Sequence, residues 1–271
     1  MNPGITPLEA SLPILHSAGR SHWQLAGESW REAATRSAKL IDQPGQIPAG
    51  NLFKRAERRL IFRLDAAHPQ HEAIVVKSFP LTHLRHRWNH QKYAPTEARN
   101  LLVAKQRGLP VPAVFACGAR RRLGLVSWNA VLVELMPGRP LKELLSNADE
   151  NTQRILLQRV LPLFKKMYET ACNHIDFGPH AILMDDARGD SLIDFQYCRF
   201  LDRASPQTFA ALAGYFGWCL TTHWNLTPPK IVHEWFELLL DFVSLNEREA
   251  LAEIFRHRLV HRASSSERLA G

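Results

Sequence analysis

Apolar and polar residues alternate with a period of two in the first half of the chain. RRLIFRLD, residues 58–65, carries an apolar residue at every second position, and AIVVKSF, residues 73–79, is rich in β-branched residues. Both patterns predict β-strands, and the linker AAHPQHE between them predicts a hairpin. VPAVFACG and LGLVSWNAVLVELMPG predict two further strands, with Gly118 and the basic residues ARRR in the turn between them.

Helical patterns are sparse in the first half and dominate the second. PTEARNLLVAKQR, residues 95–107, begins with Pro and Thr and is followed by Gly108, which predicts a helix. A shorter helix is predicted around Glu28–Ile41, and amphipathic helices are predicted from Pro206 onward. In TQRILLQRVLPLFKKMYETA, apolar residues recur at spacings of 4, 3 and 4, which predicts one helix with one buried face: Leu156, Val160, Leu163 and Met167. This order of elements predicts a two-lobed α+β fold.

Two aspartates in HIDFGPHAILMDDARGDSLIDF, residues 174–195, lie beside apolar residues. HAILM and DSLIDF predict short strands joined by the polar turn DDARGD, and a hairpin of this kind would bring both carboxylates, Asp176 and Asp194, to one edge. Two such groups suit a reaction that needs one carboxylate near an attacking hydroxyl and another on a divalent cation. A strand lysine, Lys77, and a helix glutamate, Glu97, add the arrangement found in kinases.

Each of these four residues also has an ordinary structural explanation. Asp176 suits a turn after a helix, Asp194 an exposed strand end, Lys77 a strand end in solvent, and Glu97 a helix N-terminus. The functional interpretation depends on all four occurring in the right order on the right elements.

Composition narrows the class of protein. The chain has 271 residues, 45% of them apolar and 22% charged, which is typical of a soluble globular protein. Its net charge of +8 favours an anionic partner such as nucleic acid, a phosphorylated sugar or an acidic membrane surface. None of the four cysteines has CxxC spacing, so we expect buried free thiols rather than a zinc site or disulfides. With no signal peptide and no apolar run near the ~20 residues of a membrane span, we expect a cytoplasmic protein that can still contact the membrane from inside.

Three basic segments lie in the first half of the chain. They are KRAERR at 54–59, LTHLRHRWNHQKY at 81–93 and ARRR at 119–122. A solvated face explains them, and so does contact with anionic lipid headgroups or a phosphorylated sugar at the inner membrane. Because no RNA- or DNA-binding module is recognisable, nucleic acid is not expected as a partner.

The motifs together carry a resemblance. AIVVKSF, TEARNLLVAKQRGLPVPAVFACG, LVELMPGRPL, HIDFGPHAILM and LIDFQYCRF follow one another in the order found in protein-kinase-like folds, over about residues 50–205. More narrowly, the chain resembles the bacterial lipopolysaccharide core (heptose) kinase family. Lys77 and Glu97 are 20 residues apart, and Asp176 and Asp194 are 18 apart.

The resemblance implies a role for each charged residue. Asp176 would accept or orient the proton of the attacking sugar hydroxyl, and Asp194 would bind Mg²⁺. Lys77 would hold the α- and β-phosphates of ATP, and Glu97 would orient Lys77. His174 would be a structural residue that braces the catalytic loop.

The resemblance also implies that the two halves of the chain form lobes with different functions. Residues 1–136 would form an N-terminal lobe that binds the nucleotide phosphates, and residues 137–271 a helical C-terminal lobe with the catalytic hairpin. Glu134, Leu135 and Met136 would form the hinge that meets adenine through backbone groups. The implied activity is ATP- and Mg²⁺-dependent phosphorylation of a sugar hydroxyl, heptose above all, of lipopolysaccharide core oligosaccharide or a related glycolipid. The expected location is the cytoplasmic face of the inner membrane, where the enzyme would be peripheral.

Two departures from the family pattern keep alternatives open. Kinases place a second metal ligand five residues after the catalytic aspartate, but this chain has Ala181 there, and His180 lies one position early. No GxGxxG precedes Lys77, and only PGQIPAG, residues 44–50, lies roughly where a phosphate-covering loop would start. A weak kinase, or a pseudokinase that serves as a scaffold in envelope biogenesis, is therefore an alternative. A small-molecule kinase for a cationic acceptor is a third, which the basic charge disfavours.

Overall fold

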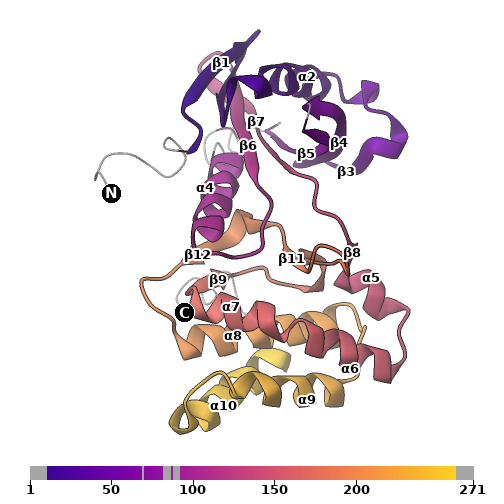
Figure 1. Ribbon diagram of the computed structural model, residues 1–271, viewed down its shortest axis with the longest axis vertical. Helices are drawn as coiled ribbons and strands as arrows, with labels where there is room; N and C mark the ends of the chain where they lie inside the picture. Colours follow the sequence, from indigo (N-terminus) through magenta and orange to yellow (C-terminus); the bar gives the residue numbers. More distant parts are fainter. Residues whose placement is uncertain (1–10, 69, 82–86, 88–91, 261–271) are drawn as a thin grey trace. The chain divides into compact units, whose positions relative to one another are not determined.

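The computed structural model describes residues 11–68, 70–81, 87 and 92–260. The described part contains a strand-rich region followed by a helical one, which confirms the predicted α+β fold class (Figure 1). Most of the basic segment 81–93 lies outside the described residues. No helix in the described ranges is both long and apolar enough to cross a membrane.

The chain divides into two compact units. The first contains Met1–Lys105 and Pro112–Leu135, and the second contains Gln106–Val111 and Met136–Gly271. This division places Met136 and the short segment Gln106–Val111 with the helical part. The domains expected from the sequence, 1–136 and 137–271, remain a prediction as functional lobes.

The first unit is built on a seven-stranded antiparallel sheet in the order β1-β2-β6-β7-β5-β4-β3. Its strands are β1 (Ile14–Ala18), β2 (Ser21–Leu25), β3 (Leu52–Ala56), β4 (Arg59–His68), β5 (His71–Pro80), β6 (Val114–Arg122) and β7 (Leu125–Glu134). The predicted β4–β5 hairpin is confirmed. The β1–β2 hairpin was not foreseen, because its residues show no clear period.

The period of two in the strands divides the side chains between the two faces of this sheet. On one face, Phe62, Ile74 and Val76 are buried in an apolar core with α2 (Arg31–Asp42). The other face receives α4 (Tyr93–Gln106), whose buried residues are Ala94, Glu97, Ala98, Asn100, Leu101 and Ala104. The small alanine side chains let α4 lie close to the strands.

The prediction of a turn at Gly118 and the ARRR segment is wrong. Strand β6 continues through the ARRR segment, and the turn is formed by Leu123 and Gly124. Gly118 serves packing instead, because a Cβ atom there would lie 2.3 Å from the Trp23 ring. Glycine is required at this position so that the indole can lie flat on the strand.

The second unit is mainly helical. Its helices are α5 (Leu141–Ser146), α6 (Glu150–Arg159), α7 (Leu161–Glu169), α8 (Pro206–Trp218), a π-helix (Cys219–His223), α9 (Pro229–Leu240) and α10 (Arg248–Val260). The single helix predicted from the 4, 3, 4 spacing is wrong, because the chain breaks at Val160 into α6 and α7. Pro162 lies in the first turn of α7, a position that suits proline because its missing N–H is not needed there.

Four aromatic side chains form the centre of the second unit. Phe164 of α7 contacts Phe177, Phe216 and Trp235 edge-on, with ring centroids 4.9–5.3 Å apart. Phe164, Phe177 and Phe216 are fully buried. Edge-on contacts between aromatic rings stabilise a fold by more than the burial of their apolar area alone. These contacts therefore hold the Phe177 side chain in place.

Short strands connect the helices of the second unit. They are β8 (Arg139–Pro140), β9 (Cys172–His174), β10 (Ile182–Met184), β11 (Ser191–Leu192) and β12 (Cys198–Phe200). Strand β10 pairs with β11 and β8, and β9 pairs with β12. The hairpin predicted around DDARGD is confirmed as β10–β11. All four cysteines are buried free thiols, as expected.

Candidate active site

Lys77 lies within β5 rather than at its end. It pairs with Ile61 of β4 on one side and with Val131 of β7 on the other. Val76 and Ser78, its neighbours in the strand, are fully buried on the opposite face. Alternation therefore directs the Lys77 side chain to the face that carries α4.

Glu97 of α4 receives this ammonium group. The Lys77 Nζ donates to Glu97 Oε1 at 2.5 Å, and the two side chains are 13% and 0% exposed. A buried ion pair seldom stabilises a fold more than apolar residues would, because both charges lose their hydration. Its presence in the middle of a sheet therefore favours a functional interpretation over the solvent-exposed lysine that the sequence also allowed.

The helix that carries Glu97 is fixed by a residue that the sequence analysis missed. Asn129 of β7 is fully buried, and its Oδ1 accepts a hydrogen bond from the Ala94 N–H in the first turn of α4 at 2.9 Å. The negative charge of Glu97 also acts on Cys117 of β6. Burial raises the pKa of the Cys117 thiol to about 12, and the charge of Glu97 adds to the rise. Both observations show α4 packed tightly on β6 and β7.

Asp176 lies in the loop after β9. It is half-buried, and the next residue, Phe177, is one of the four aromatic residues of the core. The Phe177 N–H donates to the His174 carbonyl at 3.1 Å, and the Ile175 N–H donates to Tyr197 at 3.0 Å. The loop is thus held by backbone hydrogen bonds on both sides of Asp176, and the residue itself is half-buried.

Asp194 follows β11 in an uncommon backbone conformation. Its φ is +65° and its ψ is 52°, the left-handed region that non-glycine residues rarely adopt. Phe195, which follows, is fully buried. Strain of this kind persists only where surrounding packing enforces it, and it clusters at functional sites.

His174 connects the two aspartates. Its ring lies between Phe177 and Phe195, with centroid distances of 5.3 and 5.1 Å, and its Nε2 lies 3.4 Å from the Ile193 carbonyl oxygen. Burial lowers the pKa of His174, while the charges of Asp194 and Asp176 oppose the shift. A neutral imidazole that donates from Nε2 fits this environment, and both carboxylates act on the same ring.

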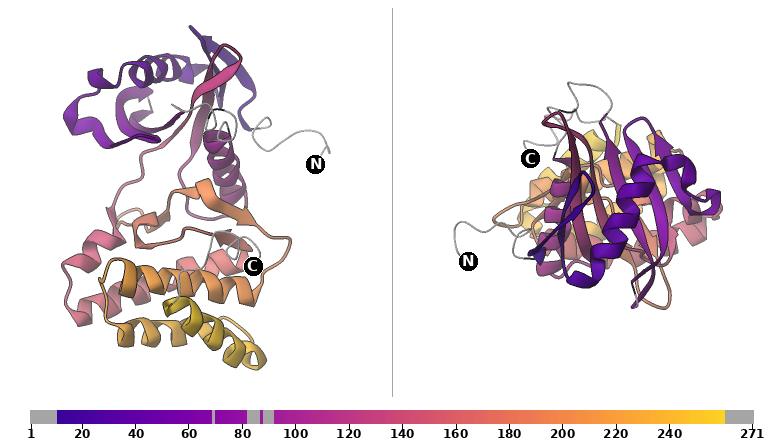
Figure 2. Two further views of the ribbon diagram at one scale, coloured as in Figure 1. Left: turned by 180° about the vertical axis from the view of Figure 1, so that it is seen from behind. Right: turned by 90° about the horizontal axis from the view of Figure 1, so that it is seen from above.

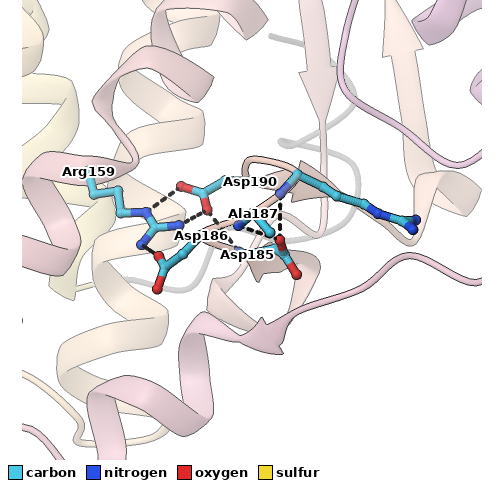
Figure 3. Close-up of polar contacts among 6 residues, drawn as sticks. Arg159, Asp185, Asp186, Ala187 and Asp190 are labelled. Carbon is cyan, nitrogen blue, oxygen red and sulfur yellow. Dashed lines mark hydrogen bonds and ion pairs between the residues drawn. The ribbon is translucent and has the colours of Figure 1, made fainter.

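The turn between β10 and β11 contains a second feature missed from the sequence (Figure 3). Arg159, the last residue of α6, donates to both oxygens of Asp190 at 2.9 and 2.5 Å, and also to Asp186. Asp190 accepts from the Asp185 N–H at 3.1 Å, and Asp185 accepts from the N–H groups of the next turn residues. These carboxylates raise the pKa of the Arg159 guanidinium. The aspartates are turn residues, as expected, but Arg159 fixes the turn that precedes Asp194.

The predicted hinge residues lie where the chain passes from one unit to the other. The Glu134 N–H donates to the Ala113 carbonyl at 2.9 Å, and a Glu134 carboxylate oxygen accepts from the Ala113 N–H at 3.1 Å. Both groups hold β7 to the segment before β6. Leu135 ends the first unit and Met136, half-buried, begins the main part of the second. Contact of Glu134 and Met136 with adenine remains a prediction.

The residues around Asp194 fit a magnesium ion only in part. Within the described ranges, no group of three or more His, Cys, Asp or Glu side chains is arranged to hold a metal. Mg²⁺ is usually bound by one or two carboxylates together with waters and substrate phosphates, and Asp194, a half-buried residue, could supply one such carboxylate. Ala181 is fully buried, and the neighbouring His180 ring contacts Trp224 edge-on at 5.3 Å.

The structure therefore assembles the predicted residues as two sets. Lys77 and Glu97 form one set in the first unit, and Asp176 and Asp194 flank His174 in the second. The segment PGQIPAG forms two 3-10 turns ahead of β3, and the β3–β4 hairpin turn lies at Glu57–Arg58. Cooperation of the two sets on one nucleotide is a proposal.

Comparisons with known proteins identify the family and the fold of the chain. The profile of the lipopolysaccharide kinase (Kdo/WaaP) family matches residues 21–224. A solved structure of WaaP in complex with acyl carrier protein is similar over 82% of this chain and 92% of that chain, with 16% identity and a TM-score of 0.51. At this identity the likeness shows the fold, which confirms a protein-kinase-like architecture. A search of curated proteins gives no match.

Proposed function

The chain belongs to the lipopolysaccharide kinase (Kdo/WaaP) family, and we propose that it transfers the γ-phosphoryl group of ATP to a heptose hydroxyl of the lipopolysaccharide core. Family membership makes it a phosphotransferase that acts on an alcohol group of a sugar. Heptose as acceptor, Mg²⁺ as cofactor and the cytoplasmic face of the inner membrane as location belong to the proposal. The observation that supports it most is the buried 2.5 Å contact between Lys77 and Glu97.

The roles proposed for the side chains follow from their charge and burial. Lys77, held by Glu97, binds the α- and β-phosphates. Asp194 would hold Mg²⁺, which when bound would supply positive charge to the phosphates. Asp176 accepts a hydrogen bond from the acceptor hydroxyl and takes its proton as the oxygen bonds to the γ-phosphorus. The bond from that phosphorus to the bridging oxygen breaks, and ADP leaves. Catalysis of this type depends mainly on positioning and charge stabilisation.

A neutral His174 supports this assignment. An imidazolium between the aspartates would compete for both carboxylates, whereas the neutral ring packs against two phenylalanines and leaves the negative charges for the proton and the metal. His174 is accordingly proposed as a positioning residue.

The charge of the chain bears on the acceptor. A net charge of +8 suits an acceptor that already carries phosphate or acidic sugars, as core oligosaccharides do. Cationic acceptors, which a small-molecule kinase of this fold would take, call for acidic surroundings instead. The anionic glycolipid is therefore preferred, at a site that a membrane-bound acceptor can reach.

The proposal is tested with purified protein, Mg-ATP and delipidated core oligosaccharide. We expect ADP release together with one added phosphate on oligosaccharide that contains heptose, and none on a truncated core that lacks it. Asp176→Asn keeps the shape of the side chain but cannot take the proton, so transfer should fall by at least about a hundredfold while nucleotide binding in a thermal-shift assay persists. If wild type binds nucleotide but transfers nothing to any core acceptor, the scaffold alternative gains and the kinase proposal fails.

A further inference from the structure

The exposed end of the sheet in the first unit carries an apolar residue in a strained turn. Leu123 is 95% exposed and has a φ of +52°, and Gly124 has a φ of +78°. A two-residue hairpin turn of this kind is normally made by Asn-Gly or Asp-Gly, which adopt positive φ easily. Leucine is an unfavourable residue in this turn for two reasons. Its side chain gains no burial, and its backbone is strained.

Basic residues surround this leucine. Arg121 and Arg122 precede it on β6 and are exposed. The β1–β2 hairpin lies beside it, because Ser21 pairs with Arg120, and this places Arg20 next to the same strand end. Figure 2 shows the two hairpin ends side by side at one end of the sheet.

A cavity of about 390 Å³ opens beside the two hairpins. Arg20, Lys39 and Arg120 line it together with Asp42, the one acidic residue among its lining residues. Asp42 is already engaged, since it pairs with Arg120 and accepts from the Trp128 indole N–H at 2.9 Å. Arg20 and Lys39 are both exposed, so the cavity presents positive charge to solvent.

We propose that this end of the sheet docks on an anionic phospholipid bilayer, with Leu123 inserted at headgroup level and a headgroup phosphate held between Arg20 and Lys39. A protruding aliphatic residue next to exposed arginines suits a fluid surface that closes around it. Protein interfaces instead centre on aromatic or arginine anchors seated in pockets. Apolar insertion and basic charge together give stable membrane binding where either alone is marginal. This inference does not depend on which sugar accepts the phosphate.

The test is co-sedimentation of the full chain with vesicles of phosphatidylglycerol and phosphatidylcholine. We expect binding that weakens with salt and is absent on pure phosphatidylcholine. Leu123→Gly should weaken binding roughly tenfold, because the inserted side chain is lost, yet it should raise the unfolding midpoint, because glycine relieves the positive φ. Leu123→Trp, which places an indole at the interface, should strengthen binding.

The charge contribution is tested separately. Arg121→Glu/Arg122→Glu should weaken binding by about twentyfold or more, since each basic residue near an anionic surface contributes about fivefold. Arg203→Glu/Arg256→Glu changes the net charge equally at exposed positions of the second unit, and is expected to alter binding by less than about threefold.

Three results would overturn the proposal. The first is that wild type does not bind the anionic vesicles. The second is that the hairpin variants bind the vesicles as tightly as wild type does. The third is that the protein binds soluble heparin but not the vesicles. The last result would assign the surface to a soluble polyanion. Turnover of a delipidated acceptor should be unchanged in the hairpin variants, so failure of this proposal can be told apart from failure of the kinase assignment.

Discussion

The two units hold their charged residues in different ways. Lys77 and Glu97 project from the middle of a strand and from a helix, and their positions are set by the ladder of β5 and by the packing of α4. Asp176 and Asp194 lie outside regular strands, in a loop and in a left-handed turn position. In the second unit no strand ladder runs through the two aspartates, so backbone hydrogen bonds of the loop and neighbouring side chains hold them in place.

The neighbours that fix the aspartates are the phenylalanines that follow them. Phe177 and Phe195 are fully buried, and both pack against His174. A buried aromatic side chain directly after each aspartate anchors a residue that no ladder holds. We infer that damage to the first unit shows as lost stability together with lost chemistry, whereas damage to the second shows mainly as lost chemistry.

The largest effect is expected at Asp194. Asn tolerates the left-handed conformation, so Asp194→Asn should keep the fold but lower turnover roughly a thousandfold, since metal-ion stabilisation of a transition state supplies several kcal/mol. The measurement is ADP release under saturating Mg-ATP, with unfolding followed in parallel. Asp202→Asn, at an exposed aspartate of the same unit, is the control and should retain full rate. Full activity in Asp194→Asn would remove it from the metal site.

The next effect concerns the buried ion pair. Lys77→Met leaves the Glu97 carboxylate buried without its ammonium partner, so the free energy of unfolding should fall by about 3–5 kcal/mol. Lys77→Met/Glu97→Leu removes both charges and should recover most of that loss, while turnover stays at least about a hundredfold down. Denaturant unfolding and ATP kinetics on both variants measure this. If the double variant regained activity, the pair would be structural only.

A smaller effect is expected from the loss of an arginine side chain in α6. Arg154 and Arg159 are almost equally exposed, at 33% and 34%, and can be compared directly. Arg159→Ala should lower the free energy of unfolding by about 1–2 kcal/mol and reduce turnover several-fold, because the bidentate contact with Asp190 fixes the turn before Asp194. Arg154→Ala loses only contacts with exposed glutamates, so its stability should change by no more than about 0.5 kcal/mol. Equal effects of the two substitutions would contradict a positioning role for Arg159.

The smallest effect is a pH dependence from His174. Its pKa is lowered in the folded protein from the ordinary value of 6.5, so the unfolded chain takes up the proton first as pH falls. The free energy of unfolding should therefore fall progressively as pH drops below 6.5, and it should not depend on this group well above pH 6.5. The difference between wild type and His174→Asn in urea unfolding, measured above and below pH 6.5, isolates the contribution. A difference that does not change with pH would mean that His174 is not buried as a neutral ring.

Regular elements of the first unit were predictable because local periodicity and tertiary packing agree there. The β4–β5 hairpin and α4 came from alternation and helix-boundary residues. Gly118 misled, because it resembles a turn residue and the reason for it, the ring of Trp23, is distant in sequence. The break at Val160 was missed because the apolar spacing continues across it, although Pro162 marked the new helix start.

The site was predictable only as far as its motif residues. Order and spacing picked out Lys77, Glu97, Asp176 and Asp194, and their proposed roles came from the resemblance. Asn129 and Arg159 carry no motif, because each acts through a contact with a residue remote in the chain. Such supporting contacts depend on tertiary structure, which a pattern of single residues does not encode.

The burial of every cysteine has a practical consequence for spectroscopy. Thiol reagents attack accessible thiolates, and burial raises the pKa of Cys117 and of Cys198. The native chain therefore provides a quiet background for site-directed labelling. One cysteine introduced on the surface of each unit would carry a pair of probes without removal of the native thiols, and their separation could be followed through a catalytic cycle.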